Sequence, residues 1–312
     1  VTVGDYAFDA PNDFSSLTSL TLGSSLTSIG DYAFYAGSAP LTSLVIPDSV
    51  TSIGRSAFSG FTGLTSLTLG SDLTSIGVGA FSGAENLTSL VIPDLVTSIG
   101  SSAFSGATNL SSVNIPSLVT SIGDNAFQDT GLTSVTIPDS VISIGQYAFS
   151  GSALTSLELG SGITTIGKDA FWQTDLTSLT IPASVTSIGE RAFGDIPLKT
   201  LVIGASLINQ SQVGYEAFFN VCQTLESVSI DTRAALGRYG SPTNRVVMGR
   251  DGTERYYRAY RGLHFGRFHD DKTYNYQLTA RQCPKLESII LGDNVVTVGD
   301  YAFDAPNDFS SL

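Results

Sequence analysis

The two histidines of the chain lie close together in the sequence HFGRFHDD, where His264 and His269 precede Asp270 and Asp271. Imidazole and carboxylate groups are common metal ligands. A zinc site needs further ligands at a characteristic spacing, and no second set of that kind is present in the sequence. We therefore expect a polar hairpin loop here, without a bound metal or another cofactor.

The serines of the chain do not fall into a catalytic pattern. The sequence has no Gly-x-Ser-x-Gly turn and no accompanying Ser/His/Asp set. The glycines recur once per repeat as turn residues, so they do not form a phosphate-binding loop. We predict that the protein is not an enzyme.

Oxygen ligands for calcium could come from Asp9, Asn12 and Asp13 in the segment DAPND. Strong calcium loops place their ligands at fixed intervals, and this segment lacks that spacing. We expect an exposed polar turn, and calcium binding is the alternative.

Three Asn-x-Ser/Thr sequons, at Asn86, Asn109 and Asn209, are candidate sites of N-linked glycosylation in a secreted eukaryotic protein. Such sequons also arise by chance in a chain rich in serine and threonine. Asn86 and Asn109 occupy equivalent positions in successive repeats, so glycans on both would crowd each other.

A short repeat runs through most of the chain. Its pattern is L-x-x-L-x-I-P/G-x-x-V/L-x-x-I-G-x-x-A-F, as in LTSLVIPDSVTSIGRSAF from Leu41 to Phe58. Leu44 and Ile46 alternate with exposed positions as in a half-buried strand, which Pro47 ends; a second extended segment and a turn with Ala-Phe follow. The steps are 22 to 24 residues, except for 27 after the ninth coil and 61 after the tenth. The coils open at Leu17, Leu41, Leu64, Leu87, Leu110, Leu132, Leu154, Leu176, Leu198, Leu225 and Leu286.

A unit this small cannot bury its own apolar face, so the copies must stack on one another. Stacking aligns the repeated isoleucines and phenylalanines into two buried columns, in which each phenylalanine removes roughly 150–250 Å² from water. We predict a β-rich repeat solenoid of about eleven coils.

The pattern LTSLTIPxSVTSIGxxAFxG resembles the BspA-type leucine-rich repeat, also called the Treponema pallidum-type repeat. The resemblance covers about 250 of the 312 residues. It implies a surface or secreted protein that acts in adhesion and interaction and is not an enzyme. Members of the family often have a cysteine three residues after the phenylalanine, where this chain has Phe61, Ala84 or Thr130. This departure removes a column of sulfur atoms and leaves the predicted fold unchanged.

Charge divides the chain into two parts. Residues 231–285 contain nine Arg and two Lys against five acidic residues, a net charge of +6, whereas the rest has four Lys or Arg against 23 acidic residues, a net charge of −19. We predict a solenoid over residues 1–230, a basic inserted module over 231–285, and a resumed solenoid over 286–312. The negative net charge of the whole chain argues against general nucleic-acid binding.

The basic segment has the pattern of a small antiparallel β module. Strands are predicted on both sides of a turn at Gly249–Gly252, and again around His269–Lys272. Three interpretations stay open: the aromatic residues form the core of the module, the module binds the acidic solenoid of another copy, or it captures a polyanion or glycan. The candidate contact residues are Arg250, Arg255, Tyr256, Tyr257, Arg258, Tyr260, Arg261 and Arg267.

The two cysteines, Cys222 and Cys283, each lie three residues before a coil-opening leucine. Stacked coils are about 4.8 Å apart, which falls within the Cα separation of roughly 4.4–6.8 Å that a disulfide requires. We predict a disulfide at the root of the module and hence an oxidising, extracellular setting. The alternative is a packed pair of reduced cysteines.

The first seventeen residues of the chain are identical to the last seventeen, Val296 to Leu312. We expect a tandem super-repeat of 295 residues in an extracellular protein that builds a filament, hair or sheath from copies of itself. The alternative is a cell-surface adhesin that binds a host protein or a glycan. No apolar run is long enough to span a membrane.

Overall fold

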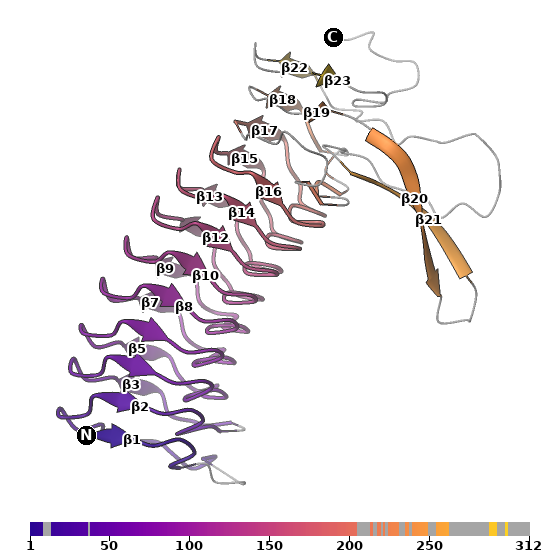
Figure 1. The fold of residues 1–312 in the computed structure, drawn as a ribbon. Coiled ribbons are helices and arrows are strands. Elements are labelled where there is room, and N and C mark those ends of the chain that lie inside the picture. The colour runs from indigo at the N-terminus through magenta and orange to yellow at the C-terminus, as the bar shows by residue number, and fades with distance from the viewer. Residues whose placement is uncertain are drawn as a thin grey trace. The chain divides into compact units, whose positions relative to one another are not determined.

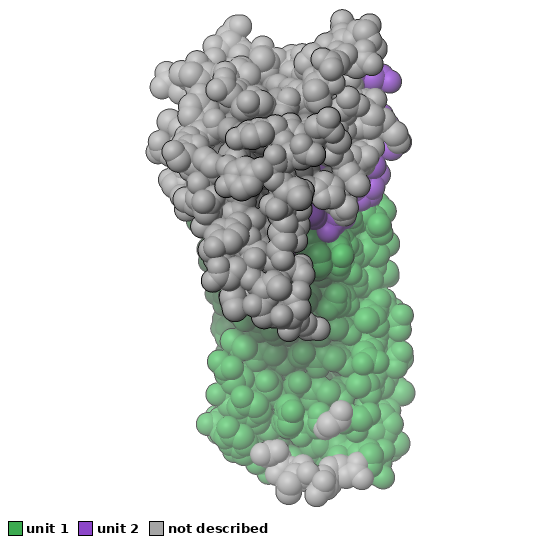
Figure 2. Space-filling model, turned by 90° about the vertical axis from the view of Figure 1, so that its right-hand side faces the viewer, with its two compact units in different colours: residues 1–175 green, residues 176–312 purple. Residues whose placement is uncertain are grey.

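The computed structural model has two compact units, residues 1–175 and residues 176–312 (Figure 2). For residues 230, 235–236, 239–248, 254–261, 289–291 and 297–298 only the backbone is described. The structure describes residues 1–8, 14–36, 38–204, 213–214, 217–219, 221, 224–230, 235–236, 239–248, 254–261, 287–291 and 297–298.

Unit 1 is a stack of coils, each contributing up to two short strands (Figure 1). This arrangement confirms the predicted β-rich solenoid, and no α-helix occurs in the part of the chain that the structure describes. The first strands are β3 (Ser43–Val45), β5 (Ser66–Thr68), β7 (Ser89–Val91), β9 (Ser112–Asn114), β11 (Ser134–Thr136) and β13 (Ser156–Glu158). The second strands are β1 (Thr2–Val3), β2 (Ser28–Ile29), β4 (Ser52–Ile53), β6 (Ser75–Ile76), β8 (Ser98–Ile99), β10 (Ser121–Ile122), β12 (Ser143–Ile144) and β14 (Thr165–Ile166).

Equivalent residues of neighbouring coils pair in parallel. Ile53 of β4 is opposite Ile76 of β6, and Leu44 of β3 is opposite Leu67 of β5. Because every coil has the same pattern, this register places like residues on like residues and the apolar columns continue from coil to coil.

The core of unit 1 contains the predicted column of phenylalanines. From Phe34 to Phe171, successive rings are stacked with centroids 5.2 to 5.6 Å apart and interplanar angles of at most 12°. The isoleucines of the second strands are also buried, with Ile53 and Ile76 each 2 % exposed. These two columns supply the apolar burial that a single coil cannot provide.

The turn before each Ala-Phe pair requires an unusual backbone. The residue that precedes Ala has a positive φ, for example 55° at Tyr32, 49° at Ser56 and 58° at Asn125. The glycine at the start of this turn is needed for a different reason: a Cβ on Gly100 would lie 2.6 Å from the carbonyl carbon of Gly77. The close approach of neighbouring coils therefore explains why this position is glycine.

Unit 2 contains a parallel sheet in the order β15 (Ser178–Ile181), β17 (Thr200–Ile203), β18 (Ser227–Ile230) and β22 (Ser288–Leu291). Its further strands are β16 (Ser187–Ile188), β19 (Ala235–Leu236), β20 (Tyr239–Met248), β21 (Glu254–Arg261) and β23 (Thr297–Val298). In this unit, Phe193 and Phe218 are stacked at 5.6 Å.

The long step between the last two predicted coils is spanned within one sheet. Strand β18 pairs with β22, with Ser227 opposite Ser288, although 61 residues separate them. Strand β19 pairs in parallel with β23, as second strands do elsewhere. The coil that opens at Leu225 therefore has its second strand at Ala235–Leu236, inside the segment 231–285.

Candidate interaction surfaces

A hairpin lies within the basic segment. Strands β20 and β21 pair antiparallel, with Arg245 opposite Tyr257 and Val246 opposite Tyr256, so the chain reverses between Met248 and Glu254 as the sequence predicted. Six of the candidate contact residues belong to β21, namely Arg255, Tyr256, Tyr257, Arg258, Tyr260 and Arg261. Arg250 and Arg267 lie outside the described residues, and so does the second predicted hairpin.

Several other predicted site residues fall outside the described part of the chain. The disulfide, the third sequon, the calcium segment and the histidine cluster therefore stay predictions. These residues are Cys222, Cys283, Asn209, Asp9, Asn12, Asp13, His264, His269, Asp270 and Asp271.

The other two sequon asparagines are exposed neighbours. The Nδ2 group of Asn86 donates to the carbonyl oxygen of Thr62 at 2.8 Å. The Nδ2 group of Asn109 donates to Oδ1 of Asn86 at 3.3 Å. Because Nδ2 is the atom that carries an N-linked glycan, a glycan on either residue would lie beside one of these contacts. Glycosylation at both positions stays a prediction.

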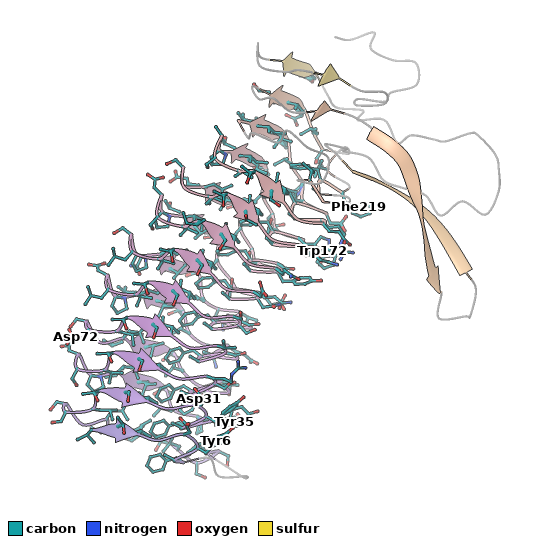
Figure 3. The ribbon with its side chains drawn as sticks, in the orientation of Figure 1. Tyr6, Asp31, Tyr35, Asp72, Trp172 and Phe219 are labelled. Carbon is teal, nitrogen blue, oxygen red and sulfur yellow. The ribbon has the colours of Figure 1, made fainter. Side chains whose placement is uncertain are left out.

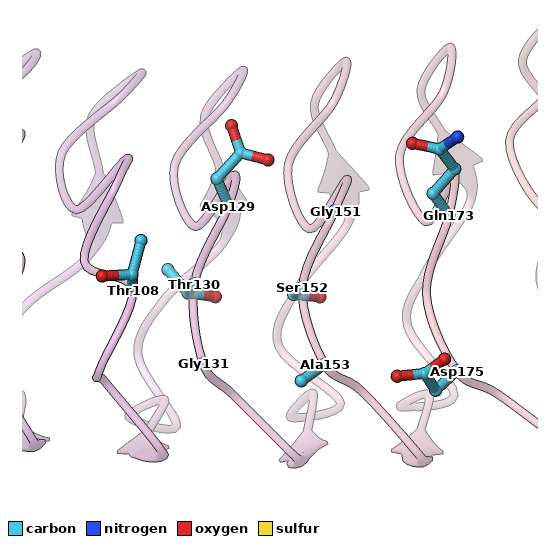
Figure 4. A pocket seen from close by; sticks show the side chains of 9 residues that line it. All are labelled: Thr108, Asp129, Thr130, Gly131, Gly151, Ser152, Ala153, Gln173 and Asp175. Atoms are coloured by element: carbon cyan, nitrogen blue, oxygen red, sulfur yellow. The ribbon is translucent and has the colours of Figure 1, made fainter.

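A shallow groove of about 370 Å³ runs across successive coils of unit 1. The side chains of Asp129 and Gln173 project from turns on either side of Gly151, which leaves the space between them open (Figure 4). A Cβ on Gly151 would collide with the carboxylate of Asp129. The groove is lined by Thr108, Asp129, Thr130, Gly131, Gly151, Ser152, Ala153, Gln173 and Asp175.

Sequence reasoning missed this groove, although a signal was present. Several coils read Phe-Ser-Gly after the turn, whereas Asp129 and Gln173 replace that glycine in two coils. Both residues adopt a positive φ, 54° at Asp129 and 56° at Gln173. A polar side chain at a position that normally has none therefore marks the rim of the groove.

The hydroxyl groups of Thr130 and Ser152, which line the groove, are already satisfied, and so is that of Thr174, between the lining residues Gln173 and Asp175. The side chains of Thr130, Ser152 and Thr174 are at most 4 % exposed. Each hydroxyl donates to the phenylalanine carbonyl three residues earlier, at 3.0, 2.6 and 3.1 Å. These residues occupy the position where the related repeats often have cysteine, and the hydrogen bonds allow a polar side chain to be buried there.

The groove offers hydrogen-bonding groups and no arrangement for catalysis. Its rim presents the carboxylates of Asp129 and Asp175 and the amide of Gln173. Among the described residues, no group of three or more His, Cys, Asp or Glu side chains could hold a metal ion. The arrangement suits weak binding of a hydroxyl-rich or cationic group.

Threonine hydroxyls form a regular column beside the second strands. The hydroxyls of Thr51, Thr74 and Thr97 donate to the backbone oxygen of the equivalent residue in the preceding coil, at 3.2, 2.9 and 3.3 Å. Since these protons bind within the solenoid, the outward lone pairs are left as acceptors.

Aspartates support the turns that follow the first strands. Ser161 donates to Oδ1 of Asp139 from its backbone N–H at 2.6 Å and from its hydroxyl at 3.0 Å. These hydrogen bonds stabilise the carboxylate and lower the pKa of Asp139. The backbone N–H of Ser71 donates to Asp48 in the same way, at 3.0 Å.

Comparison with known proteins identifies the repeat. The family described as BspA type leucine rich repeat region (6 copies) matches residues 1–133 and 120–239. The chain belongs to the BspA-type leucine-rich repeat family. Repeats of this family are generally interaction modules, and the solenoid fold is typically non-catalytic. The membership confirms the predicted resemblance.

Solved structures of other leucine-rich repeat proteins are similar to the chain. A leucine-rich repeat protein from Bacteroides ovatus is 26 % identical with a TM-score of 0.65, over 97 % of this chain and 67 % of that one. The T. pallidum leucine-rich repeat protein is 32 % identical with a TM-score of 0.42, over 46 % of this chain and 66 % of that one. No curated protein sequence matched the chain. No helix in the described part is long and apolar enough to cross a membrane.

Proposed function

We propose that the protein is an extracellular structural protein, in which super-repeats of 295 residues stack end to end into a filament, hair or sheath. The observation that carries the proposal is the identity of residues 1–17 and 296–312. Their described parts have the same role, because Thr2–Val3 forms the second strand β1 and Thr297–Val298 forms the second strand β23.

The pairing of β23 supplies a geometry for the joint. Strand β23 pairs with β19, with Ala235 opposite Thr297 and Leu236 opposite Val298. Since β1 has the sequence of β23, β19 of another copy would fit against β1 in the same register, with Leu236 opposite Val3. The same stacking would operate between covalently joined copies and between separate molecules.

The partial coil at residues 1–8, which precedes the coil that opens at Leu17, has aromatic surface that such a neighbour would cover. Tyr6 is 56 % exposed and Phe8 is 53 % exposed, whereas Phe34, one coil further on, is 3 % exposed. Burial of these rings against a preceding coil would favour end-to-end association.

Electron microscopy of the protein tests the proposal. We expect filaments with an axial repeat of about 50 Å, because eleven coils at about 4.8 Å each make up one super-repeat. The variant Phe8→Asp should shorten or abolish the filaments, and Tyr35→Asp, which also changes an exposed aromatic residue, should leave them intact. Dispersed monomers at all concentrations would contradict the proposal.

The predicted Cys222–Cys283 disulfide belongs to the same proposal, because it would stabilise the root of the basic segment in an extracellular setting. Mass measurement under non-reducing conditions should show a loss of two hydrogens. Two free thiols would remove this part of the proposal.

A second candidate function, that of an adhesin, is favoured by the polar groove. Asp129, Gln173 and Asp175 could bind hydroxyl or amine groups of a glycan or a host protein. Binding to a glycan array that is lost in Asp129→Ala and Gln173→Ala, without any filament formation by the unaltered chain, would favour this function over the structural one.

A further inference from the structure

Three exposed aliphatic side chains, those of Leu95, Leu118 and Ile142, lie on three successive coils of unit 1, and we call them the aliphatic patch. Each is 48 to 49 % exposed. Exposed apolar groups that gather in one region indicate an interaction site more strongly than scattered ones do.

The pairing of the strands brings these residues together. Leu95 and Leu118 each lie three residues before the paired residues Ser98 and Ser121, so they are one coil step apart, about 4.8 Å. Ile142 is in the next coil, where its N–H donates to the carbonyl of Thr120 at 2.8 Å. Thr120 itself is two residues after Leu118. The patch therefore continues across the three coils.

The solenoid does not need aliphatic residues at these positions. The residues equivalent to Leu95 and Leu118 in other coils are polar, as at Ser49, Asp72 and Ser140. Ile142 replaces the threonine of the hydroxyl column. The adjacent core positions are filled, since Val96, Val119 and Val141 are each 0 % exposed. The aliphatic patch therefore adds apolar surface without adding to the core.

Acidic residues surround the patch. Asp48, Asp72, Asp94 and Asp139 lie at the turns that follow the first strands, and Asp72 lies on the opposite edge of the stack from Asp31 and Tyr35 (Figure 3). The sequence of unit 1 contains two basic residues, Arg55 and Lys168, against 14 acidic ones. Both basic residues follow the glycine of the other turn, so the border of the patch has negative charges alone.

We propose that the aliphatic patch and its acidic border bind the β20–β21 hairpin of a second copy of the chain. This inference rests on the proposed function, because it assigns the surface that the basic segment contacts. The strands of the hairpin combine both required properties: Val246, Val247 and Met248 are apolar, and Arg245, Arg255, Arg258 and Arg261 are basic. The acidic border of the patch attracts the basic hairpin around an apolar centre, and it would repel an acidic partner.

Sedimentation equilibrium of the 312-residue chain at low salt tests the inference. In Asp72→Lys/Asp94→Lys, the dissociation constant for self-association should rise about tenfold or more. The control Glu85→Lys/Asp175→Lys makes the same change of net charge at exposed positions outside the patch, and its dissociation constant should change less than about threefold. Leu95→Asn/Leu118→Asn should also weaken association by about tenfold, with little dependence on salt.

A charge-reversal exchange identifies the occupant. Arg255 and Arg261 are an even number of positions apart on β21 and therefore share one face of that strand. Arg255→Glu/Arg261→Glu should weaken self-association when tested alone, and mixing this variant with Asp72→Lys/Asp94→Lys should restore association, because the introduced Glu and Lys have opposite charges. Equal weakening by patch and control variants, no restoration in the mixture, or no self-association of the unaltered chain would each overturn the inference. Filaments that form normally from Asp72→Lys/Asp94→Lys would overturn it and leave the proposed function standing. Self-association of the unaltered chain without filament formation would overturn the proposed function and leave the inference standing.

Discussion

The partial coil at residues 1–8 and the coils in the interior of unit 1 have the same sequence pattern but different surroundings. Phe8 is 53 % exposed, whereas Phe58 is completely buried. A Cβ on Gly4 would meet nothing within 4 Å, whereas one on the equivalent Gly100 would lie 2.6 Å from the backbone of Gly77. Local conformation is nevertheless the same, since Tyr6 and Tyr32 both have φ of 55°. Each coil therefore forms its own turns, and its neighbours provide the burial.

The largest expected difference between the two regions concerns the phenylalanine column. Phe104 is stacked on both Phe81 and Phe127 at 5.6 Å and is completely buried. Phe104→Ala should lower the free energy of unfolding by about 4 kcal/mol, and Phe8→Ala should lower it by about 1 kcal/mol because that ring is half exposed. Urea denaturation followed by circular dichroism measures both. Equal losses would show that neighbouring coils do not decide the burial.

Two glycine variants distinguish the effect of close approach between coils from the effect of chain flexibility. Gly100→Ala should lower the free energy of unfolding by about 3 kcal/mol, because its Cβ would press on backbone atoms that cannot move aside. Gly4→Ala makes the same chemical change where space is open, so denaturation midpoints of the two variants isolate the contact. A Gly4→Ala variant as unstable as Gly100→Ala would contradict this interpretation.

A smaller effect should come from backbone conformation alone. Gly106 has φ of 76°, and the nearest atom to its added Cβ would be 3.8 Å away. Gly106→Ala should therefore lower stability by about 1 kcal/mol through the left-handed backbone. Ser102, with φ of 56°, already has a side chain in that region, and Ser102→Ala is the matched control. Thermal unfolding should separate the two variants, and an unchanged Gly106→Ala variant would exclude the strain.

The smallest expected effect is pH-dependent. The folded-state pKa of Asp139 is lowered by the hydrogen bonds from Ser161, so its contribution to stability is fully present above the unfolded pKa and is lost as pH falls through the folded one. Asp139→Asn should therefore lower Tm slightly at pH 7, and the difference from the unaltered chain should vanish at strongly acidic pH. Measurement of Tm for both proteins across the acidic pH range tests this prediction.

Periodicity was sufficient to predict the solenoid and its buried columns. Leu44, Ile53 and Phe58 recur at fixed positions in coil after coil, and a repeated apolar residue in so small a unit must be buried by stacking. The β20–β21 hairpin was predictable from a local signal, because valines precede and tyrosines follow the Gly249–Gly252 segment, and such residues are typical of strands on both sides of a turn.

Other features do not follow from the periodicity of the repeat. The positive φ before Ala occurs at Tyr32, Ser56, Asn125 and Arg191 alike, so residue type does not reveal it. The groove at Asp129 and Gln173 depends on how three turns lie beside one another. The pairing of β19 with β23 joins residues 62 positions apart, as in Ala235 and Thr297, and no local pattern in segment 231–285 indicates it.

The order of apolar and polar residues along the chain is enough to set the length of a coil and the residues that face inward. It also establishes that the two identical segments are equivalent. Tertiary structure alone decided how deeply each repeated residue is buried. The same Ala-Phe pair leaves Phe8 half exposed and buries Phe34, since burial depends on whether another coil lies against it.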